Sequence, residues 1–199
     1  MGVPQEVFPD AWRPLLAQPA LAKLREQPLV DEALRELHRL LPPRLALHSL
    51  RTFLLADAYA SARGTGYDRV GLLAAAAFHD AGLTGSAPRV RGGFPARSAA
   101  LLDRFLAEHE VADARRRALT GAVRRHMRPF PARDAGPEAL LLHFGAWLDV
   151  TGRGCRRLPG ERRRLAELAP TPWFAVSFSA RVATCGLRRV LPAPSGAAR

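Results

Sequence analysis

Apolar side chains recur every three or four residues along most of the chain, which is the spacing of amphipathic α-helices. Valines are few and no long alternation of apolar and polar residues occurs, so strands are not indicated. Helix ends are marked by residues such as Asp31, a good N-cap, and Gly64, a good C-terminal residue. The pattern predicts helices over residues 10–17, 29–41, 43–64, 67–83, 96–110, 111–127, 138–152, 159–170 and 173–191.

Together these helices predict an all-α fold, a single compact bundle of about seven to nine helices. A chain of 199 residues can bury one sizeable core, so we predict one domain over residues 1–191. Its core is expected at about 43–185, and a frayed tail at 192–199. The helices at 67–83 and 138–152 are apolar on nearly every side, which predicts that both are buried.

A formal net charge of +12 makes nucleic-acid binding the first partner hypothesis to weigh. The basic residues are scattered arginines, with Lys23 as the only lysine, and few aromatic side chains stand among them to stack on bases. Solvated helix faces are therefore the preferred interpretation, and no nucleic-acid partner is expected. The charge remains compatible with a small anionic substrate.

Cellular location is predicted from what the sequence lacks. No run of about 18 apolar residues occurs, so no membrane span is expected. The first residues do not show the basic and then apolar pattern of a signal peptide. Cys155 and Cys185 are too few for a disulfide framework. We expect a cytoplasmic protein with reduced thiols, and a homo-oligomer is compatible with this.

The stretch AAAAFHDAGLTG ends a predicted buried helix in two titratable residues, His79 and Asp80. His48 lies in the middle of another helix, with Arg51 one turn later on the same face. Asp149 is near the end of a helix too apolar for a surface position, where a bare carboxylate would be costly. Two imidazoles and two carboxylates suit a divalent cation, and imidazole suits Zn, Fe, Ni or Co.

In this order the residues resemble the H…HD…D pattern of the HD-domain metal-dependent hydrolases. The similarity covers about residues 40–185 and is greatest to the cyanamide-hydratase-like branch. It lies in HSLRTF (48–53), AAAFHDAGLT (75–84), GPEALLLHFGAWLDVTG (136–152) and LAPTPWFAVSF (168–178). The resemblance implies an all-α fold and one divalent metal ion, zinc or iron first and manganese, cobalt or nickel as further options. It implies four metal ligands: His48, His79, Asp80 and Asp149.

The resemblance also implies a reaction, the attack of metal-activated water on a small nitrile-, cyanamide- or amide-like substrate. Asp80 is expected to hold or deprotonate the water, while Arg51 or His126 steadies developing charge. For cyanamide the product is urea. Two alternatives stay open for Arg51, support of a metal ligand or contact with substrate, and two for His126, the metal pocket or the surface. His143 is expected to pack or to support the site.

Two departures from the family pattern bear on the substrate. Many HD phosphohydrolases have an acid shortly after the His–Asp dyad, which is His79-Asp80 in this chain. Here the next residues, 81–84, are AGLT. This weakens the first alternative, a phosphohydrolase of nucleotides or other small phosphoesters. Arg97 replaces an acid that the branch places three residues after a phenylalanine, here Phe94. Arg97 and Phe94 are therefore predicted to bind the substrate, with Arg97 favouring an anionic one. Trp147, two residues before Asp149, is the third predicted substrate-binding residue, with core packing as its alternative.

Two further alternatives remain. The first is oxidative cleavage by an iron ion bound to the same predicted ligands. This reaction needs an additional iron ligand, for which His126 is the only candidate. The second is a binding domain without catalysis, including a helical nucleic-acid-binding domain with steeply salt-dependent affinity.

Overall fold

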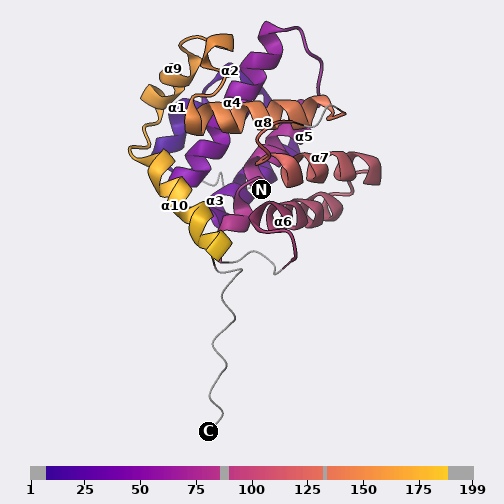
Figure 1. Ribbon diagram of the computed structural model, residues 1–199. Helices are drawn as coiled ribbons and strands as arrows, with labels where there is room; N and C mark the ends of the chain where they lie inside the picture. The colour runs from indigo at the N-terminus through magenta and orange to yellow at the C-terminus, as the bar shows by residue number, and fades with distance from the viewer. Residues whose placement is uncertain (1–7, 86–89, 132–133, 188–199) are drawn as a thin grey trace.

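The computed structural model describes residues 8–85, 90–131 and 134–187. These residues form helices and no strand, which confirms the predicted all-α fold (Figure 1). The α-helices are α1 (Arg13–Leu16), α2 (Pro19–Leu24), α3 (Pro28–Leu40), α4 (Pro43–Ala62), α5 (Arg69–Phe78), α6 (Phe94–Glu108), α7 (Asp113–Arg125), α8 (Pro137–Thr151), α9 (Glu161–Leu168) and α10 (Phe174–Leu187). The 3-10 helices are η1 (Asp10–Trp12), η2 (Ala81–Leu83) and η3 (Cys155–Arg157). The predicted frayed tail, 192–199, lies outside the described residues.

Most helices begin and end within about two residues of their predicted limits, because proline and glycine fix those limits locally. Proline occupies the first turn of α3, α4, α6 and α8, where its missing N–H costs nothing. Two segments differ more, the end of the predicted helix at 67–83 and the N-terminal segment. The predicted helix at 10–17 divides into η1 and α1, and α2 follows after Gln18, whose extended backbone separates the two short helices.

The centre of the bundle is a crossing of two helices. In Figure 1, α8 lies across α4, and these two helices make the most extensive contact in the fold. Gly145 allows their close approach: a Cβ there would lie 2.2 Å from the carbonyl oxygen of Thr52. Helix α5 packs beside α4 and is buried along its whole length from Gly71, as its all-apolar sequence predicts.

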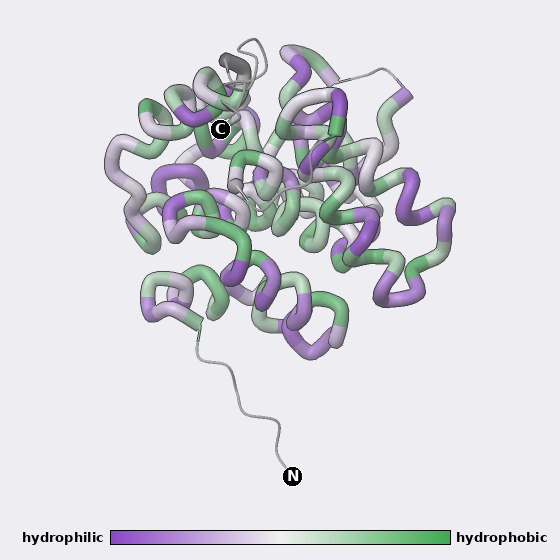
Figure 2. Tube along the Cα trace, turned by 90° about the horizontal axis from the view of Figure 1, so that it is seen from below, coloured by the Kyte–Doolittle hydropathy of each residue, from purple (hydrophilic) through white to green (hydrophobic). Residues whose placement is uncertain are grey.

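The outer turns of the bundle carry its charge, and in Figure 2 hydrophilic stretches lie toward the periphery. Arginines there pair with acids on the same or a neighbouring helix, as Arg116 does with Asp103 at 3.0 Å and Arg115 with Asp68. This agrees with the interpretation of the scattered arginines as solvated helix faces. Among the described helices, none is both long enough and apolar enough to cross a bilayer.

Candidate metal centre

The His79-Asp80 dyad lies at a change of helix type and not inside a helix that continues to residue 83, as the sequence had predicted. Helix α5 ends at Phe78, His79 caps it, and Asp80 (φ −109°, ψ 3°) precedes η2. The physical reason is a close contact at Gly82, where a Cβ would lie 2.1 Å from the carbonyl oxygen of Phe94. The Gly82 N–H also donates a hydrogen bond of 2.8 Å to Ser98 Oγ on α6. The break leaves both dyad side chains fully buried.

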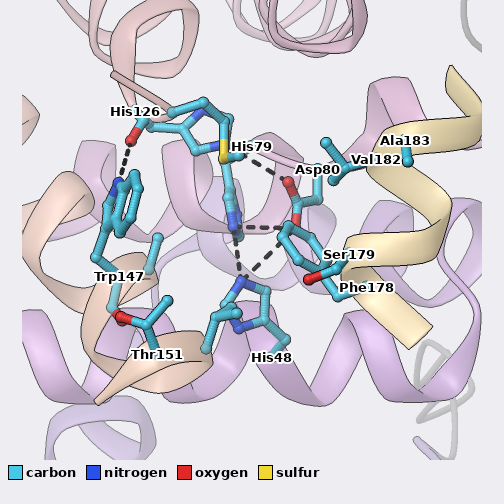
Figure 3. A pocket seen from close by; sticks show the side chains of 13 residues that line it. His48, His79, Asp80, His126, Trp147, Thr151, Phe178, Ser179, Val182 and Ala183 are labelled. Carbon is cyan, nitrogen blue, oxygen red and sulfur yellow. Dashed lines mark hydrogen bonds and ion pairs between the residues drawn. The ribbon is translucent and has the colours of Figure 1, made fainter. Parts of the chain in front are cut away.

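Three side chains from α4 and the dyad converge. His48, His79 and Asp80 each offer a donor atom within 4.8 Å of the other two, and each is at most 1% exposed. The Nε2 atoms of His48 and His79 are 3.2 Å apart. Asp80 Oδ2 lies 3.4 Å from His79 Nε2 and 3.6 Å from His48 Nε2 (Figure 3). This buried His/Asp group could hold a metal ion.

The hydrogen bonds made by the Nδ1 atoms of His48 and His79 determine the tautomer of each ring. His79 Nδ1 is 2.7 Å from the carbonyl oxygen of Ala76, and His48 Nδ1 is 2.7 Å from Asp149 Oδ2. Because a carbonyl and a carboxylate only accept, each Nδ1 carries the proton and donates it. In the neutral rings both Nε2 atoms therefore present lone pairs to the same point. Metal-binding histidines have this arrangement, with the second ring nitrogen donating to a carboxylate or backbone carbonyl.

His126, at the end of α7, belongs to the same arrangement. It is 1% exposed, and its Nδ1 donates to the Val123 carbonyl at 2.6 Å. Its Nε2 lies 3.5 Å from Asp80 Oδ1, and neither of these buried atoms has a hydrogen-bond partner. Of the two alternatives for His126, pocket or surface, the structure shows the pocket.

Two side chains of helix α8 donate hydrogen bonds to the backbone of His126. The His126 carbonyl oxygen accepts from His143 Nδ1 at 3.1 Å and from Trp147 Nε1 at 3.0 Å. His143 therefore supports the residue next to the dyad and does not face it, which agrees with the supporting role that the sequence indicated.

Asp149 lies on the far side of His48 from the three converging donor atoms. Its Oδ1 accepts from Arg51 Nε at 2.8 Å, and its Oδ2 accepts from Arg51 Nη2 at 3.0 Å as well as from His48 Nδ1. Arg51, 2% exposed, also donates to the Ala169 carbonyl and to Thr171 Oγ1. These contacts favour support of a ligand over substrate contact for Arg51. That Asp149 itself binds the ion stays a prediction.

The protonation states of the group favour a cation. Burial lowers the pKa of His79 to about 4, so its imidazole is neutral at pH 7. Burial alone would raise the pKa of Asp80, but the neighbouring imidazoles, His79 first, lower it to about 2. The hydrogen bond from His48, together with Arg51, likewise overcomes burial and lowers the pKa of Asp149 to about 2. The site thus combines ionised carboxylates with neutral imidazole.

A cavity of about 340 Å³ opens beside the group, between α8 and α10 (Figure 3). Of the predicted substrate-binding residues, Trp147 lines it. Phe94 and Arg97 are not among its described lining residues. The buried Phe94 ring instead lies 5.8 Å from the ring of His126, and the half-buried Arg97 has an Nε without a hydrogen-bond partner.

The α10 wall of the cavity was not predicted. Phe178 and Val182 line it from α10, and the rings of Phe174 and Phe178 lie tilted against the ring of His48, with centroids 5.0 and 5.7 Å away. Their spacing of four residues within a predicted amphipathic helix is the signal that could have indicated this buried face. The sequence does not say against which partner that face packs.

Comparison of the chain with known protein families gave no match, and neither did comparison with curated proteins. The HD-type pattern therefore remains a resemblance of motifs. The candidate site rests on the geometry of an all-helical chain with a buried His/Asp group.

Proposed function

We propose that this chain is a metal-dependent hydratase or hydrolase of a small nitrile-, cyanamide- or amide-like compound, of the kind that the H…HD…D resemblance implies. The observation that carries the proposal is the convergence of the Nε2 atoms of His48, His79 and His126 on the unpartnered carboxylate of Asp80. Burying such acceptors together is costly unless a cation or protons compensate them. Nitrogen and carboxylate ligands in this number suit zinc or iron.

In this proposal His48, His79 and Asp80 hold the ion. A divalent ion held there would supply Lewis-acid chemistry, namely polarisation of the substrate heteroatom and a more acidic bound water. Asp80 Oδ1, which has no hydrogen-bond partner, can accept the proton of the attacking water. His126 Nε2 faces that oxygen from 3.5 Å and can bind the substrate or the ion. Arg51 acts through Asp149, which fixes the ring of His48.

The cavity wall gives less support to phosphoester hydrolysis. A phosphoryl group is normally held by Arg, Lys or backbone amides, and the described lining residues include no Arg or Lys. Arg51 is already engaged by Asp149, Ala169 and Thr171. The missing acid after the dyad points in the same direction. A nitrile or amide group is uncharged and needs no Arg or Lys side chain in the cavity wall.

The test is to measure metal content and hydration in the same preparations. The wild-type protein is expected to carry about one equivalent of zinc or iron and to hydrate nitriles or cyanamide. His79→Ala and Asp80→Asn should lose the ion and lower activity at least about 100-fold, because each removes a donor from the cluster. Mass spectrometry of the metal and detection of the amide or urea product give the two readouts.

His109→Ala is the matched control, since His109 is an exposed histidine after α6. It should retain both metal and activity. A metal-free wild type with full activity would overturn the proposal. Oxygen uptake stoichiometric with turnover would replace it with the iron-dependent oxidative alternative, and phosphate release from phosphoesters would replace it with the phosphohydrolase.

A further inference from the structure

The cavity beside the His/Asp group is larger than a cyanamide-sized substrate needs. Its volume is about 340 Å³. An apolar protein cavity of about 150 Å³ is enough to bind benzene. A molecule as small as cyanamide, seated at the group, would leave most of this space unfilled. The volume therefore indicates that a second part of the ligand lies beyond the reacting group.

The chemistry of the walls indicates what that second part is. Away from the His/Asp group, the cavity is lined by the apolar side chains Met127, Ala146, Trp147, Val150, Phe178 and Val182. Figure 3 shows Trp147 on one side and Phe178 and Val182 on the other, so that the space lies between α8 and α10. Aromatic and aliphatic walls stabilise an apolar group by removing its surface from water, and Met127 can adapt to its shape.

Charge is confined to the His/Asp end. The other polar side-chain groups among the described lining residues are the hydroxyls of Thr151 and Ser179 and the Trp147 N–H, which already donates to the His126 carbonyl. The guanidinium of the exposed Arg153 lies 5.3 Å from the centroid of the Trp147 ring, but Arg153 does not line the cavity. Arg153 also donates to the Pro129 carbonyl. A charged group pressed against these walls would lose its hydration without a partner, which is unfavourable.

We infer that the substrate is an uncharged compound that carries an aromatic or aliphatic group at least as large as a benzene ring, held between α8 and α10. Its polar head lies at the His/Asp group, and the apolar body extends past Trp147 and Phe178. The nature of the head rests on the proposed function, whereas the size and apolarity of the body rest on the cavity alone. Thr151, Ser179 and Ala183 are exposed lining residues, so the body enters from their side.

Three amides test the inference by calorimetry, on both the metal-loaded and the metal-stripped protein. 4-Methylbenzamide, acetamide and 4-sulfonatobenzamide share the head and differ in body or charge. We expect 4-methylbenzamide to bind about 10- to 100-fold more tightly than acetamide, from burial of the ring. The sulfonate should weaken binding at least about 10-fold. Equal affinity for acetamide, or tighter binding of the sulfonate, would overturn the inference.

Cavity-filling variants locate the bound ring. Ala183→Leu on α10 and Ala146→Leu on α8 each place a larger side chain at the cavity wall. Both should weaken 4-methylbenzamide binding about 10-fold and leave acetamide binding unchanged. Ala180→Leu is the control for Ala183→Leu, since Ala180 is also an exposed alanine of α10 but does not line this cavity. Unchanged 4-methylbenzamide affinity in both cavity variants would contradict the placement.

The two proposals fail separately. If the metal-stripped protein keeps the preference for the ring but the loaded protein hydrates no C–N substrate, the proposed function is wrong and the cavity inference stands. If the protein hydrates small nitriles but binds 4-methylbenzamide no more tightly than acetamide, and neither cavity variant changes that affinity, the proposed function stands and the cavity inference is wrong.

Discussion

At the scale of single residues, the site is organised by the second nitrogen of each histidine. His48 donates to a carboxylate, whereas His79 and His126 donate to backbone carbonyls one turn earlier in their own helices. The two backbone contacts are local and follow from placing a histidine at the end of a helix. The contact of His48 with Asp149 joins residues 101 positions apart in the chain. The orientation of His48 is therefore the part of the cluster that depends on tertiary structure.

The position of Asp149 predicts a supporting role that mutagenesis can separate from metal ligation. Replacing Asp149 alone would leave the buried Arg51 without its carboxylate, so the double variant Arg51→Met/Asp149→Asn is the informative one. The asparagine oxygen can still accept from His48 Nδ1. We expect the double variant to bind zinc about 10- to 100-fold more weakly but to keep one equivalent, because it perturbs only the support of a ligand.

Asp80→Asn is the comparison, since it removes an oxygen that faces the cluster directly. Metal competition with a chelator of known affinity gives the binding constants, and circular dichroism confirms folding. Complete loss of zinc from a folded double variant, as in Asp80→Asn, would assign Asp149 as a ligand.

At the scale of helices, the crossing of α4 and α8 brings the two ends of the His48–Asp149 contact together. Gly145 lies at this crossing, directly against the backbone of Thr52. The dyad is placed in a similar way, because Gly82 lets η2 approach the first turn of α6. In both places a missing side chain determines how closely two elements pack.

Gly145→Ala should therefore disturb both the fold and the site. Its Cβ would lie 2.2 Å from the Thr52 carbonyl, so α4 and α8 must separate. We expect a loss of about 2 kcal/mol or more in the free energy of unfolding, together with weaker metal binding. Urea denaturation and metal titration measure the two effects.

Gly121→Ala in α7 is the matched control for a glycine inside a helix. Its Cβ would meet only the flexible end of Arg125, at 3.2 Å, so it should gain up to about 1 kcal/mol from helix propensity. Equal effects of the two substitutions would show that the crossing at Gly145 is not tightly packed.

At the scale of the whole molecule, the bundle removes the His/Asp group from water and covers the cavity beside it. Helix α10 supplies a wall of the cavity through Phe178 and Val182, and the buried ring of Phe174 packs near His48, while most of the other described side chains of α10 are exposed. The group is thus buried against α4 and α5 and is reached from the α8 and α10 side. Such burial couples the stability of the molecule to the protonation of His79.

The metal-stripped protein is predicted to lose stability as the pH falls from about 6.5 to about 4. Burial holds the pKa of folded His79 near 4, whereas in the unfolded chain it returns to 6.5. Between these values the unfolded chain binds a proton that the folded chain does not, so acid favours unfolding. The contribution of His79 is about 3 kcal/mol over this range.

Denaturant titrations of the wild type and His79→Asn across pH 7.5 to 4 measure this contribution as the difference in slope. Burial also lowers the pKa of His143, which adds to the pH dependence of both proteins and cancels in the difference. In the wild type Asp80, with its pKa near 2, stays ionised throughout. His79→Asn removes the imidazole that does most to lower the pKa of Asp80, so the difference in slope reports the His79–Asp80 pair. Parallel curves for the two proteins would show that His79 is not buried in the neutral state.

The sequence by itself determined the helices and the types of donor residue. Helix limits follow from proline, glycine and apolar spacing, which act within a few residues, so α3, α4 and α8 match their predictions closely. The dyad could also be selected, because polar residues at the end of an all-apolar helix need a partner. His48 was selected with it through the H…HD…D order of the motifs. The all-α fold follows from the same local patterns.

Tertiary structure decided the rest, because the direction of a side chain depends on which distant segment packs against its helix. Contacts with α6 end α5 before the dyad, and contacts with α8 turn His126 inward. The crossing of α4 and α8 places Asp149 behind His48, and the cavity forms between α8 and α10 without Arg97. The sequence specified which groups could meet a metal ion, and only the packing of the helices decided which of them face one another.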